Sequence, residues 1–174
     1  MKRTALAVML LFSALQLLTA APAKVKEFTS KEGGFSVMTP VDFEEASQDV
    51  ETAVGTIKVV MFGGQIGDAM FQIGYNDYPK GAVTADNTAA LLDGAVQGMV
   101  TNIGATLVSQ KGVTLKGYPG KELVATVKID DMDAGLKARI FIVGSRLYQI
   151  IVVAVAGAVT PETVDAFLQS LKLL

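Results

Sequence analysis

The chain has 174 residues, of which 51% are hydrophobic and 18% charged, with 15 basic and 17 acidic side chains. It contains no histidine and no cysteine. These absences exclude Ser-His-Asp and Cys-His catalysis, disulfide bonds, lipid anchoring through cysteine, and metal sites built on imidazole or thiolate ligands.

The first segment has the pattern of a secretory signal peptide. Residues 1–23 combine a short basic start, an apolar core from Ala5 to Leu18 and the cleavage pattern Ala21-Pro22-Ala23. The apolar core is shorter than the roughly 20 residues of a membrane-spanning helix, although an uncleaved anchor stays open as the alternative. We therefore predict a periplasmic or secreted protein, free of the membrane after cleavage, with one domain at 24–174. That domain has 13 basic and 17 acidic groups, a net charge of −4.

The part that follows the signal peptide is predicted to consist of strands. Alternating polar and apolar residues indicate strands at 24–29 and 35–38, and β-branched and apolar runs indicate two more at 56–62 and 69–75. Between them, the segment 42–51 is rich in acidic residues. We interpret this segment as a solvated loop that leads into a strand, with a patch for a cation or a basic partner as the alternative.

The clearest helical period lies at 86–103, where apolar residues recur every three or four positions. The apolar stripe consists of Leu92, Val96, Met99 and Ile103. Thr84 or Asp86 is the expected N-cap, and Gly104 stands where a helix ends in a left-handed residue.

The opposite face of this helix is made of small and polar residues. They are Ala90, Gly94, Gln97, Gly98 and Thr101. Each glycine inside a helix costs about 1 kcal/mol relative to alanine. We interpret the face as ordinary solvent-exposed surface, and a close approach by another backbone is the alternative.

The remainder is predicted to be a meander of strands followed by a helix. The strands are expected at 105–116, 121–129, 136–143 and 147–156. The last helix opens with Thr160-Pro161-Glu162, an N-cap, a proline at the first position and an acid in the first turn. Its apolar stripe consists of Val164, Phe167, Leu168 and Leu171. We expect Phe167 and Leu171 to pack on the sheet formed by residues 121–156.

This element order predicts an α+β fold, in which two main helices flank an antiparallel sheet. Four segments carry a resemblance to a known group: the opening Gly33-Gly34-Phe35-Ser36-Val37, the turn Gly117–Glu122, the segment Gly144–Gln149 and the closing 167–173. Together they resemble small exported bacterial proteins of the PsbP/Mog1-like kind, most of them uncharacterised. The resemblance implies an α/β/α sandwich. Photosynthetic members of the group are extrinsic proteins of the oxygen-evolving complex and nuclear members bind a small GTPase, but no functional residue of either matches a position here.

Two motifs fail the test of their spacing. The glycine-rich run 63–67 is predicted to join strand to strand, whereas a phosphate cradle needs a helix directly after the loop. Asp130, Asp131 and Asp133 lack the glycine and glutamate spacing of a calcium-binding loop, so we interpret them as a charged hairpin tip. The sequence thus predicts no catalytic residue, no cofactor-binding residue and no metal ligand.

Arg146 and Tyr148 are the candidate contact residues for a partner. Arg139 and Arg146 are the only arginines after the signal peptide, and arginine and tyrosine are enriched at interface hot spots. Arg146 is expected in a turn before a very apolar strand, where an ordinary turn residue is the alternative. Charge is also uneven, with a net −6 over 24–104 and +3 over 105–150.

Three functions are compatible with these observations. The first, which we favour, is an exported non-catalytic binding or accessory protein with a protein partner; the acidic balance argues against nucleic acid. The second is a carrier of a small apolar ligand, in a cavity between sheet and helix lined by residues such as Phe71, Met99 and Ile142. The third is a histidine-free hydrolase that uses carboxylates or a lysine. Oligomeric state is not predicted.

Overall fold

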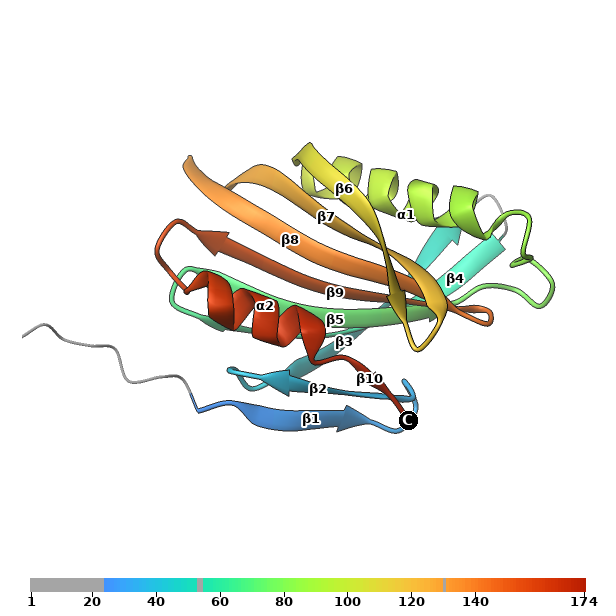
Figure 1. The fold of residues 1–174 in the computed structure, drawn as a ribbon, viewed down its shortest axis with the longest axis horizontal. Coiled ribbons are helices and arrows are strands. Elements are labelled where there is room, and N and C mark those ends of the chain that lie inside the picture. Colours follow the sequence, from blue (N-terminus) through green and yellow to red (C-terminus); the bar gives the residue numbers. More distant parts are fainter. Residues whose placement is uncertain (1–23, 53–54, 130) are drawn as a thin grey trace, which may run out of the picture.

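The structure is a computed structural model that describes residues 24–52, 55–129 and 131–174 (Figure 1). The predicted signal peptide at 1–23 lies outside the described residues, and its cleavage stays a prediction. Within the described residues, the strands form two antiparallel sheets and two helices pack against the larger one. The predicted α+β class is confirmed.

The smaller sheet joins the two ends of the described chain. Its strands are β1 (Lys26–Ser30), β2 (Phe35–Thr39) and β10 (Lys172–Leu173), in the order β1-β2-β10. The sequence analysis missed β10, because two residues carry no alternation that a pattern could detect.

The larger sheet has the strand order β3-β4-β5-β9-β8-β7-β6 within the described residues. Two meanders therefore meet in the middle, where β5 pairs with β9. The bounds are β3 (Glu44–Thr52), β4 (Gly55–Ile66), β5 (Ala69–Asp77), β6 (Thr106–Leu115), β7 (Tyr118–Ile129), β8 (Met132–Val143) and β9 (Arg146–Val155).

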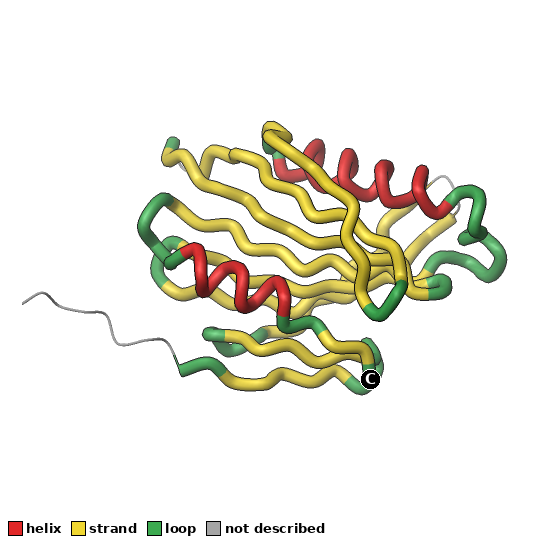
Figure 2. The backbone as a smooth tube through the Cα atoms, in the orientation of Figure 1, coloured by secondary structure: helices red, strands yellow, loops and turns green. Residues whose placement is uncertain are grey.

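The helices cover opposite faces of the larger sheet. Helix α1 (Thr88–Ile103) packs on β7 and β8, while α2 (Pro161–Gln169) packs on β8, β9 and the neighbouring β2 (Figure 2). The smaller sheet lies on the same face as α2. This layered arrangement confirms the predicted flanking of an antiparallel sheet by two helices.

Helix ends agree with the sequence in most respects. Gly104 ends α1 in the left-handed region with φ 67°, and the Thr160 hydroxyl oxygen accepts the Thr163 N–H at the start of α2, as expected. The predicted N-cap of α1 was early: the helix begins after Asn87. Thr84 instead begins the preceding turn. Its hydroxyl oxygen accepts the backbone N–H of Asn87, and the side-chain oxygen of Asn87 accepts the backbone N–H of Thr84.

One predicted loop is a strand in the structure, and two predicted turns are shorter than expected. The acidic loop prediction was wrong, because residues 44–52 form the edge strand β3, where neither face needs apolar side chains and charge blocks pairing with other chains. The predicted turn at 63–68 is shorter, since β4 continues to Ile66. The predicted turn at 130–135 is shorter too, since β8 begins at Met132.

Gly64 has a structural role that explains part of the glycine-rich run. A Cβ atom at this position would lie 2.1 Å from the Asp42 carbonyl oxygen and 2.8 Å from the Val41 side chain. The segment between β2 and β3 therefore crosses directly over β4, and only glycine leaves space for it.

Two hydrophobic cores fill the two faces of the larger sheet. The core beneath α2 and the smaller sheet, here called the aromatic core, contains Phe35, Phe62, Phe71, Tyr75, Phe141, Tyr148 and Phe167. The core beneath α1, the aliphatic core, contains Leu92, Val96, Met99, Val100, Leu123, Leu136, Ile140, Ile142 and Leu147 among others. Phe167 and Leu171 are buried as predicted, although the ring of Phe167 packs 5.2 Å from Phe71 of β5, outside the expected range 121–156.

Candidate functional site

Arg146, the first candidate residue, is held by an acidic residue on the neighbouring strand. It stands directly opposite Asp77 where β5 and β9 pair. Its Nε donates to Asp77 Oδ1 at 2.7 Å and its Nη2 to Oδ2 at 2.6 Å, a two-point pairing of guanidinium and carboxylate. The hydrogen bond from Arg146 lowers the pKa of Asp77 below its ordinary value, although partial burial acts in the opposite direction.

The same guanidinium also contacts the turn between β1 and β2. Nη1 donates to the carbonyl oxygens of Glu32 at 2.8 Å and Gly33 at 3.0 Å. The Tyr148 hydroxyl donates to the Gly33 carbonyl at 2.7 Å, and the Arg146 guanidinium carbon lies 4.4 Å from the centre of the Tyr75 ring. These contacts fasten the smaller sheet to the larger one.

This placement limits what the two candidate residues can offer to a partner. The Arg146 side chain is 23% exposed, and Tyr148 is 4% exposed. A partner would therefore reach this pair through the outer part of Arg146. The sequence analysis selected Arg146 and Tyr148 by residue type. In the structure both side chains form hydrogen bonds to other residues of the same chain.

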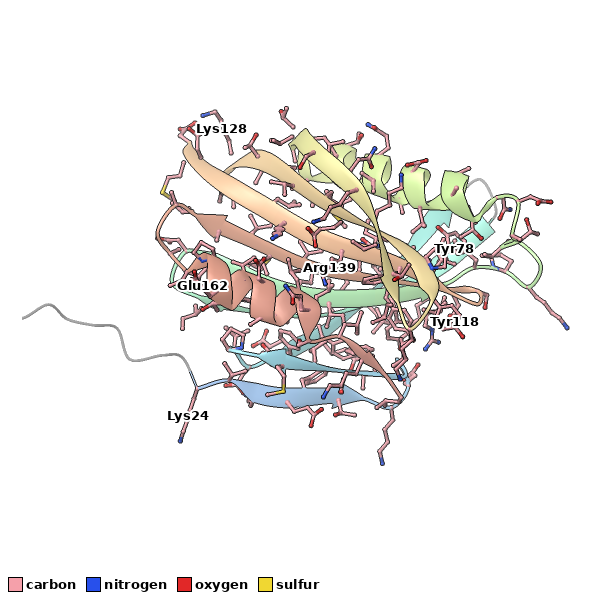
Figure 3. All side chains as sticks on the ribbon, viewed as in Figure 1. Lys24, Tyr78, Tyr118, Lys128, Arg139 and Glu162 are labelled. Atoms are coloured by element: carbon pink, nitrogen blue, oxygen red, sulfur yellow. The ribbon has the colours of Figure 1, made fainter. Side chains whose placement is uncertain are left out.

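A second ionic cluster, which the sequence analysis missed, spans three strands. Glu122 of β7 is buried, and its two carboxylate oxygens accept from Lys111 Nζ of β6 at 3.0 Å and Arg139 Nη2 of β8 at 2.7 Å. Burial alone would raise the pKa of Glu122, but the hydrogen bonds from Lys111 and Arg139 outweigh it and the pKa is lowered. Figure 3 shows Arg139 near the centre of the sheet, beside α2.

The register of the β7–β8 hairpin could have revealed this cluster. Glu122 pairs with Arg139 because both stand at equal distance from the turn between Ile129 and Met132. The predicted turn at 130–135 shifts that register, so the opposite charges do not face each other in the prediction.

A groove lies at the end of the sheet where β4 turns into β5. Its volume is about 940 Å³. Its lining residues are Lys24, Lys26, Pro40, Val41, Asp42, Glu44, Ala46, Met61, Gly63, Gly64, Gln65, Ile66, Met70 and Gln72. Lys26 and Asp42 form an ion pair within it. We call this feature the β4–β5 groove.

The predicted cavity for an apolar ligand does not have its expected lining. Phe71 belongs to the aromatic core, whereas Met99 and Ile142 belong to the aliphatic core on the opposite face of the sheet. These three side chains cannot line one cavity, because the sheet separates them. Alternating residues of a strand point to opposite faces, and the helix that covers each face was not known from the sequence.

The acidic segments show no metal site. Over the described ranges 24–52, 55–129 and 131–174, no group of three or more Asp or Glu side chains is arranged to hold a metal ion. Asp133 at the β7–β8 tip pairs with Lys128 at 2.9 Å, while Asp130 lies outside the described residues. None of the described helices is long and apolar enough to cross a membrane.

Comparisons with known proteins place the fold. No family model and no curated protein sequence matches the chain. The fold is of the PsbP/Mog1-like kind: the solution structure of cyanobacterial PsbP (CyanoP) from Synechocystis has a TM-score of 0.62 over 90% of this chain and 96% of that one, at 15% identity.

Two further solved structures are more distant. A protein from Bacteroides thetaiotaomicron has a TM-score of 0.49 at 14% identity, over 86% of this chain and 48% of that one. A protein of unknown function from Pseudomonas aeruginosa has a TM-score of 0.40 at 10% identity, over 81% of this chain and 86% of that one. At these identities the likeness concerns the fold alone.

Proposed function

We propose that this chain is an exported accessory protein, periplasmic or secreted, that binds a segment of a partner protein in the β4–β5 groove and does not catalyse a reaction. The observation that carries the proposal is the groove itself, about 940 Å³ of open space at an end of the sheet that neither helix covers. Export rests on the signal-peptide pattern at 1–23.

The chemistry of the groove suits an extended protein segment with apolar side chains. Met70 and Ile66 are 40% and 41% exposed, and Met61 lies beside them in the same groove. Methionine side chains adapt to varied apolar partners. Gly63 and Ala46 line the groove without large side chains, and the polar lining residues supply hydrogen-bonding groups beside the apolar ones.

The two carboxyl groups with shifted pKa values are not suited to act as general acids or bases. The pKa values of Asp77 and Glu122 are both lowered, because each carboxylate accepts hydrogen bonds from basic side chains. A general acid or base works best with a pKa near the operating pH. Both shifts go the other way, which is the behaviour of structural ion pairs.

Arg146 is proposed as a second contact, through the exposed part of its side chain. It stands on β9, opposite Asp77 at the end of β5 that lies away from the groove. Substituting Arg146 also releases the β1–β2 turn, so binding through it has to be compared with the loss of stability. The groove therefore gives the cleaner test.

The experiment compares two methionines that are exposed to a similar extent. A photo-crosslinking amino acid replaces Met70 in the groove or Met132 at the β7–β8 tip, which does not line the groove and is 43% exposed. We expect a discrete adduct in the exporting cell from position 70 and none from position 132. The partner identified in the adduct, once purified, should bind Met70→Glu at least tenfold more weakly than the unchanged protein, and Met132→Glu equally well. Equal adducts from both positions, or unchanged affinity of Met70→Glu, would contradict the proposal.

A further inference from the structure

A smaller pocket lies between α1 and the strands β4, β5 and β9. Its volume is about 250 Å³, enough for about eight water molecules. It is lined by Ile57, Val59, Asn76, Tyr78, Ala95, Gly98, Met99, Asn102, Leu147 and Gln149. We call it the amide pocket. It shares no lining residue with the β4–β5 groove, so an inference about it goes beyond the proposed function and stands separately.

Asn76 is the unusual residue of this pocket. Its side chain belongs to the buried part of the protein, with 6% of the residue exposed, yet within the described chain its amide makes no hydrogen bond. Ser30 and Thr39 are buried to a similar extent, and their hydroxyl groups hydrogen-bond to the backbone. A buried polar group without a partner reduces stability.

The amide of Asn76 opens to the pocket and not into sealed space. Among the described residues, no side-chain nitrogen or oxygen that is sealed from solvent lacks a hydrogen bond. The unpartnered amide of Asn76 is therefore open to solvent, and Asn76 lines the amide pocket. Its donor and acceptor atoms are free for a ligand.

Three more polar side chains face the same space without using their hydrogen-bonding groups inside the described chain. They are Gln149 of β9, Asn102 of α1 and Tyr78, which follows β5. Tyr78 is labelled in Figure 3. Burial raises the pKa of Tyr78, which keeps its hydroxyl protonated and able to donate. The pocket thus offers three amide groups and one hydroxyl, all uncharged at neutral pH.

The apolar side of the pocket is formed by the aliphatic core. Met99 and Leu147 are buried there, and Ile57 and Val59 of β4 complete the apolar lining. Among the residues whose side chains the structure describes, none that lines the pocket is charged. A charged ligand would lose its hydration without gaining an opposite charge, whereas a neutral one meets donors, acceptors and apolar surface.

We propose that the amide pocket binds a small neutral molecule that carries a carboxamide next to a short apolar group. A carboxamide presents one carbonyl acceptor and an N–H donor pair, and it complements the side chain of asparagine or glutamine at both atoms. The apolar group then lies against Met99, Leu147 and Ile57. The pocket volume limits the ligand to the size of a single amino-acid amide.

Gly98 is a lining residue that brings no side chain into the pocket. A Cβ atom built on Gly98 would meet nothing within 4 Å, so no contact of the protein requires glycine there. The same is true of Gly94, one turn earlier on α1, but Gly94 does not line the pocket. The two positions therefore form a matched pair in which an added methyl group narrows the pocket at one and not at the other.

The test uses three probes of the same shape and different charge. Isovaleramide is neutral, isovalerate is an anion and isoamylamine is a cation at neutral pH. We expect isovaleramide to shift the side-chain amide signals of Asn76, Gln149 and Asn102 in ¹H–¹⁵N spectra with a millimolar dissociation constant. The two charged probes should bind at least tenfold more weakly. Equal shifts from all three probes, or shifts that miss these amides, would overturn the proposal.

Two variants decide whether the pocket residues carry the binding. Asn76→Leu keeps the size of the side chain and removes the unpartnered amide. It should weaken isovaleramide at least tenfold while the melting temperature rises by about 2–4 °C. Gly98→Ala should weaken isovaleramide and Gly94→Ala should not. Unchanged affinity in both Asn76→Leu and Gly98→Ala would overturn the proposal, even if one variant proved unstable.

Discussion

The two faces of the larger sheet solve the same packing problem with different side chains. On the aromatic side, α2 and the smaller sheet together cover the strands, and rings such as Phe71 and Phe167 fill the wide space between the layers. On the aliphatic side, α1 alone covers part of the sheet, with leucine, valine, isoleucine and alanine beneath it. The difference decides where open space remains.

Polar groups follow the same division. At the border of the aromatic core, Arg146 and Tyr148 direct their hydrogen-bonding groups to atoms of the protein itself. At the border of the aliphatic core, Asn76 lies beside a pocket and has no such partner in the described chain. On the aromatic side, the polar groups stabilise the fold. On the aliphatic side, which is only partly covered, polar groups stay available to bind a ligand. The predictions below test that division.

Phe167→Ala should cause the largest loss of stability among these variants. The ring is 1% exposed and packs edge-on against Phe71, so its removal leaves a cavity between α2 and the sheet. We expect the free energy of unfolding to fall by about 3–5 kcal/mol in urea titration. Val25→Ala, at an exposed position, should change it by less than about 0.5 kcal/mol. A loss below about 1 kcal/mol for Phe167→Ala would mean that α2 does not depend on the aromatic core.

Gly64→Ala should cost about 1–3 kcal/mol, because the new methyl group would overlap the Asp42 carbonyl oxygen where the chain crosses β4. Gly63→Ala is the matched control, since the nearest atom to its Cβ position is 3.6 Å away. Thermal unfolding of the two variants side by side measures the difference. Equal melting temperatures would show that the crossing is not held tightly.

Asp77→Asn should lower the free energy of unfolding by about 1 kcal/mol at neutral pH, a figure kept small because half of the carboxylate side chain is exposed to solvent. The pKa of Asp77 is lower in the folded protein than the ordinary value of 3.8. The stabilisation is therefore complete above that ordinary value and disappears as the pH falls through the lower folded value. Urea titrations across pH 7 to 2 should show the two proteins converge in acid, and a constant difference would exclude the ion pair as the cause.

Gly94→Ala and Gly98→Ala should give the smallest change, a gain of about 0.5–1 kcal/mol each, because alanine loses less backbone freedom in a helix and neither methyl group meets another atom. Calorimetry on the two variants checks this. A loss of stability in Gly98→Ala alone would show that the rim of the aliphatic core is more tightly packed than the structure has it.

Patterns within each segment of the sequence predicted most helices and strands, but they did not predict which distant strands pair. The periods of α1 and α2, the alternation of β5 and β7 and the apolar run of β9 follow from the side chains within each segment. β3 escaped because an edge strand carries charge on both faces. β10 escaped because its only reason for extension is β2, which lies far away in the chain.

The candidate sites were less accessible to sequence reasoning than the fold. Arginine and tyrosine were singled out by type, but their interaction with Asp77 and the β1–β2 turn depends on strand order. Asn76 carries no sequence signal at all, because an asparagine near the end of a strand usually faces water. It becomes notable only when Met99 and Leu147 are seen to bury it without a hydrogen-bond partner.

The pairing of β10 with β2 also sets the order in which the chain can fold. Leu173 stands opposite Phe35, and the Leu174 N–H donates to the Gly34 carbonyl oxygen. The smaller sheet can therefore close only after residues 172–174 have been synthesised. Such a late, long-range closure slows folding, and a chain that threads through a membrane from its first residue stays without this closure until its last strand has crossed.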